Sequence, residues 1–253
     1  MELTILMPCL NERETLPGCI AEAQLFLARA GVEGEILIAD NGSTDGSQAV
    51  AQGRGARVVQ VARRGYGAAL RGGIEAARGA YVIMGDSDGS YPFDELDGFL
   101  AALRAGAQLV VGDRYAVPCE PGAAPWLNRR VGVPFLSWLG RRLGNCAVRD
   151  FHCGLRAVER RAFLTLGARA DGMEFASEMI LLAGAAGQTV AQAPVRLRRD
   201  GRGRRPHLRP LRDGLRHVAV ILRLARQARA GKREAAAAPA RKGGEKERRC
   251  EHG

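Results

Sequence analysis

The sequence lacks several features that would each point to a particular class of protein. It has no run of eighteen or more apolar residues, so it predicts no transmembrane helix. Its first residues carry no basic segment ahead of an apolar one, so we expect no secretory signal. Six cysteines are present, but they form no CxxC pair and match no zinc-binding or disulfide spacing. These absences favour a cytoplasmic protein with free, buried thiols.

Aromatic residues are also scarce, at 5%, which argues against a large β-sandwich core. Glycine is abundant instead, with 33 residues, and indicates many tight turns. Hydrophobic residues (46%) and charged residues (26%) occur in the proportions of an ordinary globular protein. A chain of 253 residues is long enough for one sizeable α/β domain with additional segments, but short for two domains.

The net charge of +11 is concentrated toward the end of the chain. Residues 196–253 contain 19 Lys and Arg against 6 Asp and Glu, whereas residues 1–195 contain 19 against 21. A nucleic-acid-binding protein more often spreads basic charge over its folded surface, and almost no aromatic residue lies among these arginines. We therefore expect no nucleic-acid partner. The basic segment suits phosphate groups, an anionic membrane surface or simple solvation.

Short apolar runs alternate with helical stretches, which is typical of a mostly parallel sheet covered by helices. Strands are expected at 3–7, 35–39, 57–61, 81–84, 108–111 and through 189–190, and helices at 12–30, from Asp45 onward, and at 66–78, 126–144, 172–184 and 211–229. Ser43 or Thr44 is a candidate cap for the helix from Asp45. We divide the chain into an α/β domain (1–210), which includes a loop at 200–210, a basic amphipathic helix (211–230) and a disordered tail (231–253).

Charged side chains directly follow several of the expected strands. Asp40, Asp86, Asp88 and the pair Asp113-Arg114 all occupy such positions. Ligands of open parallel sheets bind beyond the carboxyl ends of the strands. We therefore expect these side chains to form one binding site at one edge of the sheet.

Asp86-Ser87-Asp88 is the central motif of that site. Two carboxylates two residues apart can hold a Mg²⁺ or Mn²⁺ ion together with the phosphate oxygens that the ion carries. An Asx turn is the alternative, because Asp-Ser-Asp-Gly also favours one. The position of the motif after an apolar strand, with Asp40 after another, favours the metal site.

The segment from Asp40 to Gly46 also has two interpretations. It is either a capped turn that leads into a helix, or a nucleotide site in which Asp40 accepts hydrogen bonds from a base. No G-K-[ST] follows it and no GxGxxG follows the first strand, which disfavours P-loop and dinucleotide binding.

Several segments together carry a resemblance to a known family. The motifs of family 2 glycosyltransferases of the GT-A fold resemble MPCLNERETL, ADNGSTDGS, RGYGAALRGGIEAARGAYVIMGDSDGSYPFDEL and VVGDRY. The dolichyl- or polyprenyl-phosphate hexosyltransferase branch of this family is similar in DFHCGLRA and GMEFASEMI. The resemblance covers about residues 1–217. It implies a Rossmann-like, mostly parallel sheet flanked by helices.

The resemblance also implies roles for individual residues. Asp86 and Asp88 match the metal-binding pair, with Asp88 the more direct ligand, and Ser90 stands where the branch often has Gln or His as a further ligand. Arg114 and Arg156 match basic residues that face the acceptor phosphate. Glu178 matches an acidic residue near the sugar and acceptor. The residues matched to the nucleotide-sugar site are Pro8, Leu10, Asn11, Glu12, Asp40, Gly67, Asp86, Ser87 and Arg202. Arg202 belongs to a basic loop (202–207), for which the alternative interpretation is a solvated linker.

We therefore expect a metal-dependent, inverting glycosyltransferase that moves a hexose from a GDP-mannose or UDP-glucose type of donor to polyprenyl phosphate. An ionised phosphate acceptor needs no strong base, whereas a hydroxyl acceptor would need Asp150 or Glu178. Apolar stripes with arginines at 126–144 and 211–229 predict peripheral association with the inner face of the cell membrane. The alternative is a soluble acceptor, such as a natural-product aglycone or an aminocyclitol, and a nucleic-acid-binding protein is a more distant one.

Overall fold

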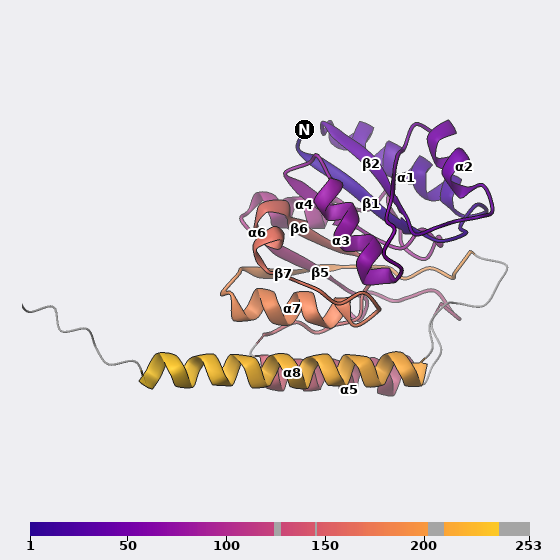
Figure 1. The fold of residues 1–253 in the computed structure, drawn as a ribbon. Coiled ribbons are helices and arrows are strands. Elements are labelled where there is room, and N and C mark those ends of the chain that lie inside the picture. Colours follow the sequence, from indigo (N-terminus) through magenta and orange to yellow (C-terminus); the bar gives the residue numbers. More distant parts are fainter. Residues whose placement is uncertain (124–127, 145, 202–209, 238–253) are drawn as a thin grey trace, which may run out of the picture.

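A computed structural model describes residues 1–123, 128–144, 146–201 and 210–237 (Figure 1). Seven strands form one sheet in the order β3-β2-β1-β4-β6-β5-β7. Neighbouring strands run parallel, except that β6 runs antiparallel to both β4 and β5. The strands are β1 (Leu3–Cys9), β2 (Gly34–Asp40), β3 (Arg57–Gln60), β4 (Tyr81–Met84), β5 (Leu109–Asp113), β6 (Arg156–Glu159) and β7 (Val190–Pro194).

Helices cover the sheet and extend beyond it (Figure 1). Because parallel strands need long crossover connections, most of the helices lie between consecutive strands. The helices are α1 (Leu16–Ala30), α2 (Ser47–Gly53), α3 (Tyr66–Ala76), α4 (Asp97–Arg104), the π-helix η1 (Asn128–Gly132), α5 (Val133–Gly144), α6 (Arg160–Thr165), α7 (Phe175–Ala185) and α8 (Pro210–Ala237).

Strand β1 lies near the middle of the sheet, between β2 and β4, and its apolar side chains are fully buried. A parallel strand covered on both faces reads as a continuous apolar run, which is the pattern of residues 3–7. Its register pairs Cys9 with Asp40 and Leu6 with Met84. The residues that follow β1, β2 and β4 therefore emerge at the same edge of the sheet, where the sequence predicted a site.

A second layer lies below the sheet (Figure 1). Helices α5 and α8 contact each other, and both contact α7. Among the helices of the described ranges, none combines the length and the apolar character needed to cross a membrane.

The predicted fold class is confirmed, and the first five expected strands lie within two residues of their predicted ends. The strand expected through residues 189–190 is β7. Strand β6 and helices α4 and α6 were not expected. The antiparallel β6 is stabilised by its pairing with β4 and β5, which a four-residue sequence pattern does not reveal.

Several helix ends differ from the predicted ones. Helix α1 begins at Leu16 rather than at residue 12, with Pro17 in its first turn, where a missing N–H is tolerated. Helix α2 begins at Ser47, and Gly46 at its N-cap makes no side-chain cap, so Ser43 and Thr44 do not cap it. Helix α8 continues to Ala237, beyond residue 230, where we expected disorder to begin. The expected loop at 202–207 and the tail at 238–253 lie outside the described residues.

Candidate active site

One cavity of about 810 Å³ opens at the carboxyl ends of β1 and β4. Its polar end is lined by the loop after β1, the Asp86-Ser87-Asp88 segment and Arg114. Its other end is apolar and is lined by α5, the start of α7 and α8. A pocket of this size with a few convergent polar groups is typical of a binding site for a small substrate or cofactor.

The Asp86-Ser87-Asp88 segment is held in place by backbone and hydroxyl contacts. The Ser87 hydroxyl donates to the Pro8 carbonyl (2.9 Å), and the Ser87 carbonyl accepts from the Thr15 hydroxyl (2.6 Å). The Asp88 carboxylate accepts from the backbone N–H of Ser90 (3.0 Å) and from its hydroxyl (2.5 Å). The Asx turn and the pair of cavity-lining carboxylates are therefore both present, and one does not exclude the other.

Three residues that the sequence did not single out surround Asp86. Burial raises the pKa of Tyr66 well above its ordinary value, and the charge and hydrogen bond of Asp86 raise it further, so the phenol keeps the proton it donates. A Cβ added to Gly154 would lie 2.5 Å from Asp86 Oδ2 and 3.0 Å from the Tyr91 ring. The Gly154 N–H donates to the Tyr91 hydroxyl (2.8 Å). Any larger residue at position 154 would therefore require the Asp86 carboxylate or the Gly154 loop to shift.

The loop after β1 and the turn after β2 form one interlocked unit. Asn11 adopts a left-handed backbone (φ 61°), its N–H donates to the Ser43 hydroxyl (2.9 Å), and its side-chain carbonyl accepts from Thr44 N–H (2.7 Å). The buried Asp40 carboxylate accepts from the N–H groups of Gly42 and Ser43 and from the Gln48 amide.

Most residues predicted for the nucleotide sugar lie in or beside this unit. Pro8, Leu10, Glu12, Asp86 and Ser87 line the cavity. Gly67 is buried in α3, where an added Cβ would lie 2.4 Å from the Ala170 carbonyl. Arg202 lies outside the described residues.

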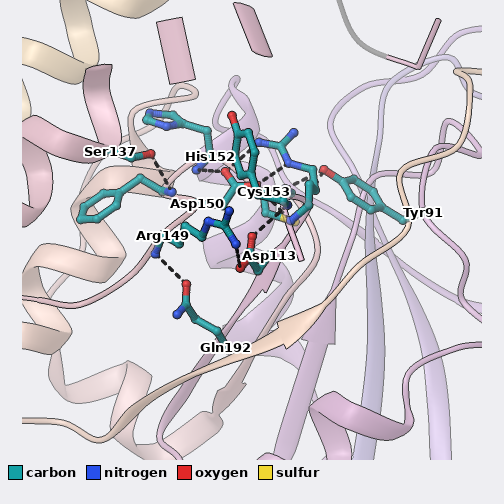
Figure 2. A network of polar contacts seen from close by, with 12 residues as sticks. Tyr91, Asp113, Ser137, Arg149, Asp150, His152, Cys153 and Gln192 are labelled. Atoms are coloured by element: carbon teal, nitrogen blue, oxygen red, sulfur yellow. Dashed lines mark hydrogen bonds and ion pairs between the residues drawn. The ribbon is translucent and has the colours of Figure 1, made fainter. Parts of the chain in front are cut away.

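Arg114 is placed at the cavity wall by a buried acid. Its guanidinium makes a two-pronged ion pair with Asp150, with Nε–Oδ2 and Nη2–Oδ1 distances of 2.6 and 2.8 Å. The Asp150 carboxylate also accepts from His152 N–H (3.1 Å), and its surroundings are shown in Figure 2. Arg114 lines the cavity, whereas Asp150 is fully buried behind it.

Two further predicted residues bind the backbone. Arg156 reaches the cavity wall, but it donates to the carbonyls of Cys153, Phe151 and Ala176. Glu178 is buried in α7 and accepts from the N–H groups of residues 169 and 170, at 2.9 and 2.6 Å. In this geometry both residues order the loops around the cavity.

A pair of histidines joins α8 to the cavity. His217 of α8 lies 2.8 Å, through Nδ1, from the Ser177 hydroxyl of α7 and 3.3 Å from His152 Nε2. Burial lowers the pKa of His152 well below 6.5, and the charges of His217, Arg156 and Arg114 lower it further. His152, which burial keeps neutral, therefore contacts the helix that forms the apolar end of the cavity. The apolar stripe of residues 211–229 did not reveal this contact.

Known proteins are similar to this chain in sequence. A model of glycosyl transferase family 2 matches residues 4–167. A low-salt glycan biosynthesis hexosyltransferase of Haloferax volcanii is 36% identical over 222 residues, which are 87% of this chain and 53% of that protein. A dolichyl-phosphate hexose transferase of the same organism is 28% identical over 195 residues, covering 77% of this chain and 82% of that one.

A solved structure is similar as well. Glucosyl-3-phosphoglycerate synthase of Mycobacterium tuberculosis, crystallised with Mn²⁺, UDP and phosphoglyceric acid, superposes with a TM-score of 0.64 and 26% identity. The match covers 88% of this chain and 78% of that one. The chain spans about half the length of the Haloferax hexosyltransferase.

The seven-stranded sheet and its similarity to the solved structure define a protein of the GT-A fold. The chain belongs to glycosyltransferase family 2, as its motifs predicted. Its relatives include enzymes named for hexose transfer to dolichyl phosphate.

Proposed function

We propose that the protein transfers a hexose from a nucleoside-diphosphate sugar to a polyprenyl phosphate, with inversion at the anomeric carbon. The observation that carries this proposal is the single cavity that joins two carboxylates at one end to an apolar wall at the other. A nucleoside-diphosphate sugar, with its bound cation, needs the carboxylates, and the prenyl chain of a lipid acceptor needs the apolar wall close to them.

The carboxylate end fits a divalent cation such as Mg²⁺ or Mn²⁺. Asp86 and Asp88 both line the cavity, and within the described ranges no group of three or more His, Cys, Asp or Glu side chains is arranged to hold a metal. Two carboxylates leave coordination positions for diphosphate oxygens, which is how these ions commonly bind in enzymes that use phosphate substrates. When bound, the cation would neutralise the negative charge of the departing diphosphate.

The nucleoside is proposed to lie against the interlocked loops after β1 and β2. Asp40 orders the second of these loops through its hydrogen bonds to Gly42, Ser43 and Gln48. That Asp40 accepts hydrogen bonds from the nucleotide base stays a prediction, and the identity of that base is not assigned.

The acceptor phosphate is proposed to lie at Arg114, between the polar and apolar ends. Asp150 accepts from Nε and Nη2 and so fixes the guanidinium, whose Nη1 N–H groups are left to donate to a phosphate. A phosphate oxygen attacks the anomeric carbon, the new C–O bond forms, the bond to the diphosphate breaks, and the nucleoside diphosphate leaves. No proton has to be removed from an ionised phosphate. In this scheme Asp150 is a positioning residue, and the catalytic roles of Arg156 and Glu178 stay predictions.

The prenyl chain is proposed to follow the wall that α5 and α8 contribute. The cavity reaches Phe135 and Leu136 of α5 and Leu215 and Val218 of α8. The α5/α8 layer also exposes large apolar side chains, which a protein surface in water rarely gathers. We call these residues the apolar platform: Val131, Phe135, Trp138, Leu215 and Leu222. Exposed Arg130 and Arg142 flank it in sequence, which favours contact with an anionic membrane surface.

A soluble acceptor is the second candidate. The structurally similar glucosyl-3-phosphoglycerate synthase is crystallised with phosphoglyceric acid, a small soluble acid. The extent of the apolar wall favours the lipid, because a small polar acceptor gains little from it.

Two assays test the proposal in sequence. A thermal-shift panel of nucleoside diphosphates and their sugars, with and without Mn²⁺, identifies the donor, because a bound ligand raises the unfolding temperature. Transfer of radiolabelled sugar is then measured with polyprenyl phosphate and with 3-phosphoglycerate. Label that reaches the organic phase supports the lipid acceptor. Label found only in the aqueous product supports the soluble one, and no transfer to either contradicts both.

A further inference from the structure

A second pocket, of about 470 Å³, lies against a different face of α8 from the cavity of about 810 Å³. It is enclosed by the loop from Arg169 to Glu174, the start of α3 and one face of α8. Arg216, Val220 and Arg223 provide that face, since spacings of four and three residues place side chains on the same side of a helix. The cavity of about 810 Å³ meets residues 214, 215, 217 and 218 of α8 instead, and Arg64 and Gly65 line both pockets.

The pocket has more positive than negative charge. Four guanidinium groups line it, those of Arg64, Arg169, Arg216 and Arg223. Of the two acids in the lining, Asp171 already pairs with two arginines outside the lining, Arg63 (2.5 Å) and Arg71 (3.0 Å). The other acid, Glu174, accepts a hydrogen bond from Gly172 N–H (3.3 Å). The Glu174 Oε2 atom is buried and has no hydrogen-bond partner among the described residues, so one lining carboxylate without an ion-pair partner stands against four lining guanidinium groups.

Two of these arginines have side chains that no other group holds. Across the part of the chain that the structure describes, the guanidinium groups of Arg169 and Arg216 have no hydrogen-bond or ion-pair partner, and both side chains are exposed. Arg223 reaches Glu178 only at 3.6 Å, and Arg64 donates to the carbonyls of Asn41 and Gly42. Unpartnered guanidinium forks facing one pocket suit a phosphate group, which they bind through two parallel hydrogen bonds.

We propose that this pocket binds a phosphate-bearing anion at a site separate from the Asp86–Asp88 pair. The ligand is the phosphate of an anionic lipid headgroup or a free phosphate compound. The positions of two leucines favour a lipid headgroup as the source of the phosphate. Leu215 and Leu222, which belong to the apolar platform, each precede a pocket arginine by one residue on α8. The phosphate and the acyl chains of one lipid would then meet adjacent sides of the same helix.

The test variant is Arg169→Gln with Arg216→Gln. Both side chains are exposed and have no partner among the described residues, so the fold does not depend on them. The matched control is Arg78→Gln with Arg161→Gln. It removes the same charge from two exposed arginines outside the pocket, one just before β4 and one just after β6. Unfolding temperatures without ligand confirm that both variants are folded.

The first measurement is calorimetric titration with inorganic pyrophosphate in EDTA, at constant ionic strength, so that no divalent cation assists binding at Asp86 and Asp88. We expect the pocket variant to bind at least about tenfold more weakly than the native chain, because charge-assisted hydrogen bonds are lost. The control is expected to stay within about twofold. Equal weakening in both variants, or none in either, would overturn the proposal.

The second measurement identifies the source of the phosphate. Vesicles of phosphatidylcholine, with and without phosphatidylglycerol, are sedimented with each variant. Selective loss of the pocket variant from the phosphatidylglycerol vesicles assigns the site to a lipid headgroup. Retention equal to that of the control, together with weakened pyrophosphate binding, assigns it to a free phosphate compound. Neither measurement uses a sugar donor, so the outcome is independent of the proposed transfer reaction.

Discussion

At the scale of single residues, Asp88 combines two tasks. Its carboxylate accepts from the Ser90 N–H and hydroxyl, which orders the turn after β4, and it also lines the cavity of about 810 Å³. An amide in its place keeps the shape and can still accept hydrogen bonds from Ser90, but it loses the negative charge. A substitution can therefore separate the structural task from the proposed cation-binding one.

We predict that Asp88→Asn lowers transfer at least about 100-fold while the protein stays folded, because loss of the cation removes several kcal/mol of transition-state stabilisation. The measurement is the initial rate of label transfer across a range of Mn²⁺ concentrations. Glu95→Gln is the control, since Glu95 is an exposed acid nearby that lines no part of the cavity. Unchanged transfer by folded Asp88→Asn protein contradicts the metal role.

Gly154 is the second residue for which the structure predicts a sharp effect. A methyl group at this position would lie 2.5 Å from Asp86 Oδ2, so Gly154→Ala must displace that carboxylate or its own loop. We predict a loss of about 1–3 kcal/mol in the free energy of unfolding from overpacking. Metal-dependent donor binding is expected to weaken as well.

Urea unfolding and a donor thermal shift measure the two effects of Gly154→Ala. Gly18→Ala is the matched control, because a Cβ on Gly18 in helix α1 meets nothing within 4 Å. That variant is expected to be as stable as the native chain or more stable, by up to about 1 kcal/mol. Normal donor binding by Gly154→Ala would show that the close approach to Asp86 has no functional consequence.

At the scale of elements, the packing of α8 involves a buried histidine, His152, whose ring contacts His217 of α8. The groups that face His152 are His217 of α8, Ser177 of α7, and the cationic Arg114 and Arg156. Its pKa lies well below 6.5 in the folded chain, so below about pH 6.5 the unfolded chain binds a proton that the folded chain does not. Stability is therefore complete above that pH and is lost as the pH falls toward the folded pKa.

We predict that the free energy of unfolding falls by up to about 1.4 kcal/mol per pH unit below pH 6.5 because of this one group. Urea titrations between about pH 5 and pH 8 measure the slope. In His152→Gln the slope over this range is expected to be smaller, since the titrating ring is gone. Equal slopes in the two proteins would contradict the role of His152, whatever their absolute stabilities at pH 8.

The elements that were predicted correctly are those with a strong local signal. Strands β1, β2 and β5 are continuous apolar runs, because both faces of the sheet are covered. The position of Asp40, Asp86 and Asp88 then followed from the rule that parallel strands gather their carboxyl ends at one edge. By contrast, the contacts of Tyr66 and Gly154 with Asp86 join segments far apart in the chain, and no spacing within a motif indicates them.

At the scale of the whole molecule, charge and apolar surface are distributed unevenly. Residues 196–253 carry the excess of Lys and Arg, and the α5/α8 layer carries the exposed apolar platform. The cavity of about 810 Å³ reaches both helices of that layer, so the surface that we propose as the membrane contact would also deliver a lipid acceptor to Arg114. A substitution on this surface is therefore expected to change both the binding to vesicles and the rate of transfer to a lipid acceptor.

The last prediction follows from this coupling. Phe135→Ser with Trp138→Ser removes two stacked side chains of the platform, which are 53% and 54% exposed, and so costs the fold little. We expect several-fold weaker sedimentation with anionic vesicles, because insertion of apolar groups is lost while the electrostatic attraction remains. The rate with vesicle-bound polyprenyl phosphate should fall with it, whereas metal-dependent donor binding should not change. Leu25→Ser with Leu164→Ser, which removes exposed leucines outside the platform, should leave all three measurements unchanged. Equal vesicle binding by both double variants would exclude the platform as the membrane contact.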